Sequence, residues 1–473
     1  MIILGLSLMT GVVWAGGQLD RTKRPEGKPA PVIHLPDIQK ATLKNGLQVW
    51  LVEDHKLPLV AMNLVVQAGS DHDAPTMPGI ATMTSDMIDE GTKSRTTLQI
   101  ADELDALGAS LGSSASLDGS FVSLRTLSKN LDKALQIYTD VIAHPVFPEK
   151  EFERLRKQRL ASLVQQRDQP PAIASNAFNY ILYGSDNAYG NNTGGTEKSL
   201  QGMTWKDLAQ FYQSYYHPNN ATLIVVGDAT LPEIVPLLEK GLGDWQQAQI
   251  PSFTVPQPPG TLERKVYLID KPGAPQSEIR IGYPALARST PDYFPVTVMN
   301  RMLGGQFTSR INLNLRERHG YTYGASSSFR FLKGVGPFVA AGGIVTEKTD
   351  SAIVECLHEI DLMRDKGMTA DELAYSKKGA IGGFALTFET PVQIAGALQN
   401  IVLYGLPDNY YNRYLQNIDA VSVADVQRVA SKYLDASKMA VVVVGDLAKI
   451  KDGITALKLG DVVLCDLDGK KLQ

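Results

Sequence analysis

Two stretches of this chain repeat the same succession of local signals, and this repeat limits the possible folds more than any other feature. Each stretch has a hydroxyl side chain at the start of an amphipathic helix, and then an apolar strand that ends in Gly-Asp. The same 23 positions separate Thr204 from Gly227 and Ser422 from Gly445. Equal spacing over a whole helix–strand unit favours internal duplication. The alternative is coincidence between two ordinary α/β units.

The length and composition of the chain agree with two copies of one domain. The chain has 473 residues, of which 44% are hydrophobic and 20% charged, as expected for a globular protein of more than one domain. A proline-rich segment, residues 247–262, separates the copies and is predicted to be a linker. We therefore predict an α+β fold of two tandem homologous domains, residues 37–246 and 263–473, each with an antiparallel-rich sheet covered by helices.

Local patterns place helices and strands within the first domain. Residues 110–127 alternate small or polar side chains with apolar ones, as two antiparallel strands do. Thr97 is predicted to cap a helix that Gly108 stops. Further helices are predicted over residues 131–142, 149–166 and 172–182, and residues 185–195 are predicted to form a Gly/Asn-rich loop.

The first residues differ from the rest of the chain. Residues 2–14 form an uncharged apolar run, and small residues suited to signal peptidase follow at Ala15. We predict a signal peptide over residues 1–15, an extended arm over 16–36 and a periplasmic location without a stable membrane anchor. A frayed apolar N-terminus is the alternative. The net charge of −4 provides no basic field for nucleic acid.

One segment of the first domain, residues 79–91, is predicted to be a helix with two distinct faces. Its apolar residues recur at helical spacing and are expected to face a core, while Thr82, Ser85 and Asp86 share a second face. Gly91 is placed to end the helix. A Gly-Thr pair closes the segment.

This frame resembles the zinc helix of the M16 metallopeptidases, the pitrilysin-like or inverzincin family, whose motif is H-x-x-E-H followed by Gly-Thr. Thr82, Ser85 and Asp86 stand at the three chemical positions. Two hydroxyls and one carboxylate are poor zinc ligands. The family takes a further glutamate ligand from a later helix, but no carboxylate stands near the expected position, Ser162. We therefore assign no metal ligand and no cofactor to this chain.

The histidines elsewhere in the sequence do little to replace the missing zinc ligands. No two of the seven histidines are three or four residues apart. His72 lies near Asp71, Asp73 and Asp86 in sequence, and a makeshift metal site there is the alternative. Each histidine is otherwise interpreted as a surface or capping residue.

The second domain carries a segment that is similar to the Leu-Arg-Glu-x-x-Gly-x-x-Tyr signature of the same family. A helix is predicted to end at Gly320 and a strand to follow it, with Arg316 and Tyr323 at the signature's Arg and Tyr positions. The resemblance implies that these two residues bind the substrate backbone and stabilise the tetrahedral intermediate. Without it, Arg316 is a helix-end arginine that pairs with Glu317, and Tyr323 is a half-buried strand residue.

The resemblance implies a half-enzyme. In two-chain M16 enzymes one subunit carries the zinc motif and the other carries the Arg/Tyr pair. This chain is similar to the second kind, inactive alone and paired as a heterodimer with a zinc-bearing M16 homologue that cleaves peptides. The first alternative is a catalytically inactive structural or peptide-binding protein. The second is an autonomous peptidase with an unusual metal site.

Overall fold

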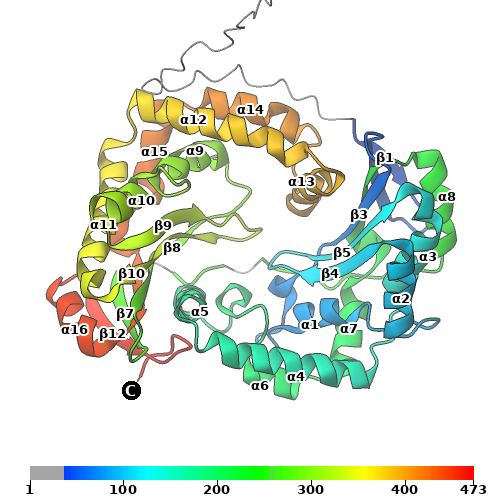
Figure 1. The fold of residues 1–473 in the computed structure, drawn as a ribbon, viewed down its shortest axis with the longest axis horizontal. Coiled ribbons are helices and arrows are strands. Elements are labelled where there is room, and N and C mark those ends of the chain that lie inside the picture. The colour runs from blue at the N-terminus through cyan, green and yellow to red at the C-terminus, as the bar shows by residue number, and fades with distance from the viewer. Residues whose placement is uncertain (1–36, 256, 261–262, 473) are drawn as a thin grey trace, which may run out of the picture. The chain divides into compact units, whose positions relative to one another are not determined.

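The computed structural model of the protein describes residues 37–255, 257–260 and 263–472. The predicted signal peptide and arm, residues 1–36, lie outside these described residues. Two mixed sheets of six strands each carry the fold, and helices cover them (Figure 1). The predicted α+β class is thus confirmed. Among the described residues, no helix is long and apolar enough to cross a membrane.

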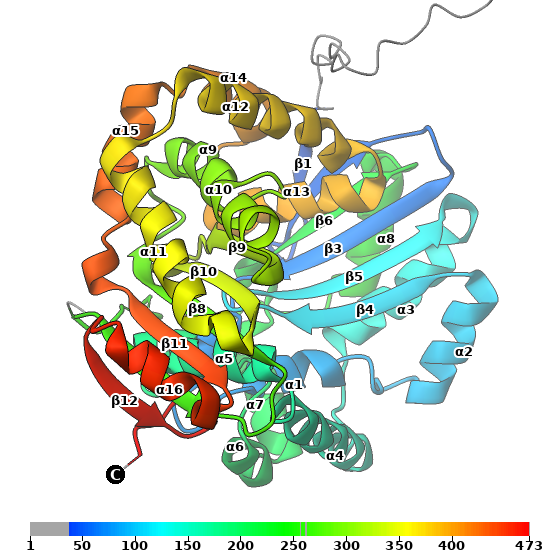
Figure 2. The same cartoon turned by 60° about the vertical axis from the view of Figure 1, so that its left-hand side comes forward.

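The first sheet has the strand order β1-β2-β6-β3-β5-β4, and Figure 2 shows β3, β5 and β4 side by side. Only β2 and β6 pair in parallel, and the other neighbours are antiparallel. The predicted antiparallel pair within residues 110–127 is β4 and β5. The strand bounds are β1 Gln39–Thr42, β2 Gln48–Glu53, β3 Leu59–Val66, β4 Ser110–Ala115, β5 Ser120–Leu127 and β6 Ala221–Gly227.

The second sheet has the order β12-β7-β11-β8-β10-β9 and repeats the first from its second strand onward. Here β7 and β11 pair in parallel as β2 and β6 do, but the outer strand β12 is parallel to β7 whereas β1 is antiparallel to β2. The bounds are β7 Lys265–Asp270, β8 Gln276–Leu286, β9 Thr322–Phe329, β10 Gly336–Val345, β11 Ala440–Gly445 and β12 Asp461–Cys465.

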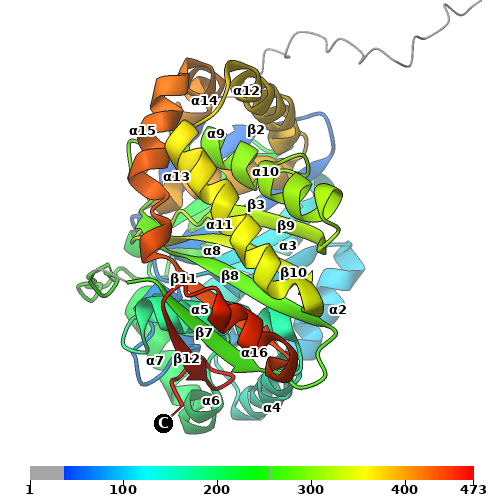
Figure 3. The same cartoon turned by 90° about the vertical axis from the view of Figure 1, so that its left-hand side faces the viewer.

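The helices of the first half are α1 Ile80–Met87, α2 Thr97–Leu107, α3 Leu131–Ala143, α4 Glu149–Gln166, α5 Pro170–Tyr183, α6 Glu197–Gly202, α7 Trp205–Tyr215 and α8 Leu231–Leu242. Those of the second half are α9 Tyr293–Leu303, α10 Arg310–Asn312, α11 Thr349–Lys366, α12 Ala370–Phe384, α13 Pro391–Tyr404, α14 Tyr410–Ala420, α15 Val423–Tyr433 and α16 Leu447–Ala456. Helices α11 and α16 lie across the second sheet (Figure 3). Short 3-10 turns and one π-helix, η5 Leu313–Arg318, complete the fold.

The repeated helix–strand units are α7–β6 and α15–β11. Thr204 and Ser422 both cap their helices through reciprocal bonds, the first with Asp207 and the second with Asp425. Such capping boxes satisfy backbone N–H groups that a helix start leaves free. The two stretches predicted to be duplicated therefore begin in the same way.

Strand β6 is buried on both faces, and each face packs against a different half of the chain. Leu223 and Val225 belong to the core of the first half. Ile224 and Val226 pack with Ile394 of α13, a helix of the second half that also contacts β3. Burial on both faces explains why the strand reads as a continuous apolar run.

Strand β11 shows the reciprocal arrangement. Val441 and Val443 belong to the core of the second half, and Val442 and Val444 pack with Phe178 of α5. Helix α5 belongs to the first half and contacts both β8 and β11. Each half thus supplies a helix that covers the other half's sheet.

Two predicted helix ends are wrong by a few residues. Helix α1 ends at Met87 rather than at Gly91, which instead forms an isolated antiparallel bridge with Thr96. Thr96, not Thr97, caps α2, because its side chain accepts from the backbone N–H of Gln99. Gly108 ends that helix in the left-handed conformation, as predicted.

Candidate functional site

Helix α1 is held in place by its start and by its apolar face. Gly79 adopts a φ of 92°, which glycine tolerates best, immediately before the helix. The Asp73 carboxylate accepts bonds from the backbone N–H groups of Gly79 and Ala81, at 2.6 and 3.0 Å. Met83 and Met87 are fully buried in the core of the first half. The position of the helix therefore needs no metal.

The polar face of α1 is occupied by contacts within the protein. The Thr82 hydroxyl donates to the backbone carbonyl of Thr193 at 2.7 Å. Ser85 is buried, and its hydroxyl lies 3.2 Å from the hydroxyl of Tyr216. Burial raises the pKa of Tyr216, so this phenol stays protonated. Neither hydroxyl is left free to bind an ion.

Asp86, the one carboxylate on this face, is paired with an arginine. Its oxygen Oδ2 forms an ion pair with the guanidinium of Arg159, which lies on α4. Helix α4 is the later helix from which the family resemblance expects a glutamate ligand, and Arg159 stands one turn before Ser162. A fixed cation thus lies beside the carboxylate where the resemblance expects a metal ion.

The surroundings of this face do not fit zinc. In the described ranges, no three His, Cys, Asp or Glu side chains form a group that could hold a metal ion. The makeshift site considered at His72 is not assembled: His72 bonds Asp71 at 2.6 Å and stacks on Phe253. Asp73 and Asp86 are engaged with the α1 backbone and with the α4 arginine. A donor set of two hydroxyls and one paired carboxylate does not match zinc chemistry.

Arg316 lies on the π-helix η5, which continues the short helix α10. Its guanidinium carbon is 4.5 Å from the ring centre of Phe307, and its Nε is 3.3 Å from a carboxylate oxygen of Glu317. The pairing with Glu317 is the contact expected if Arg316 were only a helix-end residue. The Phe307 ring is 62% exposed, so this cation–π contact faces open surface.

Tyr323 is the second residue of the edge strand β9 and is 88% exposed. It is therefore more open to solvent than the half-buried strand aromatic that the residue type alone suggests. Gly320, with a φ of 65°, ends the preceding helix, and the backbone N–H of Tyr321 bonds the carbonyl of Leu315. These contacts join η5 to β9. Among the described residues, Arg316 and Tyr323 share no hydrogen bond, and both keep donors available to a ligand.

The family follows from comparison with known proteins. Residues 48–196 match the family model described as Insulinase (Peptidase family M16), and residues 202–380 match that of the Peptidase M16 inactive domain. Together these models cover strands β2 to β10, and so parts of both sheets. The chain belongs to the M16 peptidase family, as its motifs predicted.

Individual relatives include proteins with and without peptidase names. A Helicobacter pylori protein called Non-peptidase homolog YmxG is 24% identical, over 84% of this chain and 92% of its own length. Zinc protease PqqE of the same organism is also 24% identical, over 85% and 91%. The crystal structure of a peptidase M16 inactive domain from Pseudomonas fluorescens has a TM-score of 0.81 and 27% identity, covering 86% of this chain and 98% of that chain. Overall sequence similarity therefore does not distinguish relatives named as peptidases from those named as non-peptidases, and only the site residues can make this distinction.

Sequence reasoning missed Arg159. The signal was present, because Arg159 is a basic residue on the helix that resemblance assigned to a carboxylate ligand, and Asp86 is an acidic residue at a histidine position. Opposite charges at two positions that should both bind one cation indicate an ion pair. A pocket of arginines and tyrosines in the second half was also missed, and its residues lie on five separate segments of the chain.

Proposed function

We propose that this protein is the non-zinc subunit of a two-chain M16 peptidase, located in the periplasm and paired with a zinc-bearing homologue. The partner supplies the zinc-bound water and the general base. This chain supplies Arg316 and Tyr323, which bind the peptide backbone and stabilise the oxyanion of the tetrahedral intermediate. The products are two shorter peptides.

The observation that carries the proposal is the contrast between the two signature segments. The face of α1 is closed by Thr193, Tyr216 and Arg159, while the signature tyrosine of the second half stands 88% exposed on an edge strand. This phenol is therefore accessible to a peptide, whereas the polar groups of α1 are already bonded within the protein. Membership of the M16 family and the inactive-domain match support the same role.

The test is peptide cleavage by the purified pair. We expect neither the isolated chain nor the partner alone to cleave an unfolded peptide at the rate of the mixture. Arg316→Ala and Tyr323→Phe should each lower kcat by about 10²–10³-fold, the usual cost of one oxyanion donor. Arg318→Ala is the matched control, since Arg318 is exposed on the same π-helix.

The controls separate binding from chemistry. Association of the two chains, followed by analytical ultracentrifugation, should be the same for the wild type and the three variants. Cleavage that is unchanged by Arg316→Ala and by Tyr323→Phe contradicts the shared site, even if the two chains associate.

A second candidate function, an inactive peptide-binding or structural protein, is favoured by one specific contact. Arg316 pairs with Glu317, which satisfies its charge without a substrate. The name of the non-peptidase relative agrees with this candidate. Glu317→Gln distinguishes the two functions: it frees the guanidinium and should raise cleavage by the pair if Arg316 acts on substrate, whereas unchanged cleavage favours the structural protein.

A further inference from the structure

A pocket of about 730 Å³ in the second half is lined by basic and aromatic side chains. This volume lies within the range of ~300–1,000 Å³ that is typical of ligand pockets. Three arginines and five tyrosines are among its lining residues, and no aspartate or glutamate is. The pocket is therefore positively charged, and its walls are aromatic rings.

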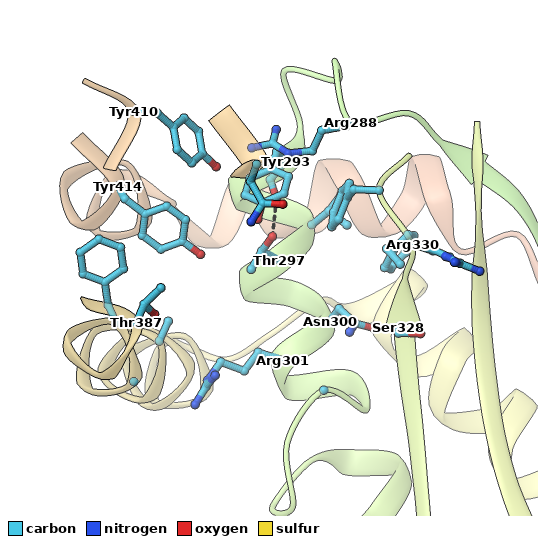
Figure 4. A pocket seen from close by; sticks show the side chains of 18 of the residues that line it. Arg288, Tyr293, Thr297, Asn300, Arg301, Ser328, Arg330, Thr387, Tyr410 and Tyr414 are labelled. Atoms are coloured by element: carbon cyan, nitrogen blue, oxygen red, sulfur yellow. Dashed lines mark hydrogen bonds between the residues drawn. The ribbon is translucent and has the colours of Figure 1, made fainter. Parts of the chain in front are cut away.

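Two of the arginines flank α9. Arg288 lies before the start of this helix and Arg301 near its end, and in Figure 4 the hydroxyls of Tyr410 and Tyr414 point toward α9 between them. The Arg288 guanidinium is 3.8 Å from the ring centre of Tyr293 and 5.1 Å from that of Tyr410. These contacts hold the planar group in one orientation.

Neither arginine is neutralised by the protein. Arg288 is only 9% exposed, and the Nε of Arg301 is buried without a hydrogen-bond partner. In the described part of the chain, no carboxylate pairs with either guanidinium. A buried charge without a partner is costly, so this arrangement is poised to receive an anion.

The fold around these side chains makes room for them. A Cβ atom added at Gly379, in the middle of α12, would lie 2.7 Å from Nη2 of Arg301. Glycine inside a helix costs about 1 kcal/mol relative to alanine, so its presence here is explained by the guanidinium that packs against it. Helix α9 itself is fixed at its start: Asp292 precedes α9 and forms ion pairs with Arg428 and Lys432 of α15.

The tyrosines supply neutral donors. Burial raises the pKa of Tyr410 and of Tyr414, so both phenols keep their protons at neutral pH. A phenol that stays protonated can donate to an anion's oxygen, and its ring offers an apolar surface for the group that carries the anion. Hydroxyl donors beside a guanidinium match a planar carboxylate.

We infer that this pocket binds a carboxylate of a peptide, either an acidic side chain or a C-terminus, next to an apolar side chain that contacts the tyrosine rings. The inference rests on the proposed function only for the choice of a peptide as the carrier. Strand β9 supports that choice: Ser328 lines the pocket, and Tyr323 lies near the start of the same strand. The two residues are five positions apart, about 17 Å at ~3.4 Å per residue, and an extended peptide covers this span with a similar number of residues.

The test is isothermal titration calorimetry on the isolated full chain with unlabelled peptides. The probe is a short peptide with one central Glu-Phe pair and both ends blocked, and its counterpart carries Gln-Phe. A third peptide has Gln-Phe and a free C-terminal carboxylate. We expect the Glu-Phe peptide, the free-terminus peptide or both to bind about 10–100-fold more tightly than the blocked Gln-Phe peptide, the value of a charge-assisted hydrogen bond. Which of the two binds identifies the source of the carboxylate.

Protein variants place the binding in this pocket. Arg288→Gln and Arg301→Gln should each abolish the preference for the carboxylate, while Arg301→Lys should retain part of it. Arg413→Gln is the matched control, because Arg413 lies exposed on α14 outside the pocket lining. High salt should weaken binding, since the Debye length falls from about 10 Å at 0.1 M to about 3 Å at 1 M.

Two results overturn the inference. One is equal binding of all three peptides, which needs no protein variant. The other is a loss of the preference for the carboxylate peptide that is as large with Arg413→Gln as with Arg301→Gln. Because the titration uses no partner subunit, it is independent of the cleavage assay: cleavage that depends on Tyr323 while the pocket binds no carboxylate refutes the pocket alone, and the reverse refutes the proposed function alone.

Discussion

Asp292 connects the helix that carries the arginine–tyrosine pocket to the rest of the second half. Its side chain is 5% exposed and accepts from Arg428 at 2.6 Å, Lys432 at 3.0 Å and the hydroxyl of Tyr433 at 2.7 Å. Burial raises the pKa of this carboxyl, but the three bonds lower the pKa by more, so that it falls from an ordinary 3.8 to about 2. We therefore predict that Asp292→Asn destabilises the second half and with it the pocket.

The magnitude follows from the pKa difference. The 1.8 pH units between 3.8 and about 2 correspond to about 2.4 kcal/mol, since each unit is worth ~1.36 kcal/mol. Because the pKa of Asp292 is lower in the folded state than in the unfolded chain, this stabilisation is complete above about pH 5 and is lost as the pH falls through about 2. About half of it remains at pH 3. For a domain of this size the full loss lowers Tm by about 5–10 °C.

Thermal unfolding followed by circular dichroism at pH 7, 5, 4 and 3 measures this effect. The matched control is Asp452→Asn, which removes the same charge from an exposed position on α16. We expect the difference in Tm between wild type and Asp292→Asn to be largest at pH 7 and 5 and to narrow toward pH 3. The control should differ little from wild type at any of these values.

Two outcomes would refute this reasoning. If the Tm difference stays constant from pH 7 to pH 3, the charge of Asp292 does not carry the stabilisation. If Asp452→Asn lowers Tm as much as Asp292→Asn does, the loss reflects net charge rather than the three bonds.

Two further predictions concern the first half. Introducing the zinc motif by Thr82→His, Ser85→Glu and Asp86→His, with Ser162→Glu as the further ligand, should still give weak zinc binding, because the Arg159 cation stays beside the site. Adding Arg159→Gln should tighten zinc binding by about tenfold or more, measured by competition with a zinc-binding dye. Equal zinc affinities of the two variants would contradict the role of that cation. Asp118→Ala should destabilise the contact between the two halves by about 1–3 kcal/mol per donor left unpaired, because the buried Asp118 carboxylate accepts from the hydroxyls of Tyr189 and Tyr404 and from a backbone N–H of the second half. We expect faster hydrogen exchange in both α5 and α13. Faster exchange in only one half would contradict this prediction.

The repeat predicted two helix–strand units correctly. The capped helix starts at Thr204 and Ser422 and the strands that end in Gly-Asp depend on neighbouring residues only, so their signals lie within a few positions. Helix ends were less accurate: α1 stops at Met87 although Gly91 is the obvious terminator, because Gly91 is engaged in a bridge with Thr96. That bridge depends on the path of the following chain, which no helical pattern reveals.

The candidate site divides in the same way. Arg316 and Tyr323 were found because their signature is contiguous, and their catalytic role stays a proposal. Arg159 was missed because its partner Asp86 stands 73 positions away. Arg288 and Arg301 were missed because their importance comes from what surrounds them: tyrosines of α14 and a glycine of α12 meet α9 only after folding.

The sequence by itself determined the repeated helix–strand unit, the family and the absence of histidine and glutamate at the zinc-motif positions, because each depends on residue type and spacing over a short stretch of chain. Only the tertiary structure decided that α5 and α13 each cover the sheet of the other half, that an arginine pairs with the one carboxylate on the polar face of α1, and that unpaired guanidiniums line one pocket. The physical reason is that burial and pairing depend on side chains far apart in the chain. The sequence of an apolar helix face does not show which sheet the helix covers, and the sequence around a charged residue does not show whether an ion-pair partner lies nearby.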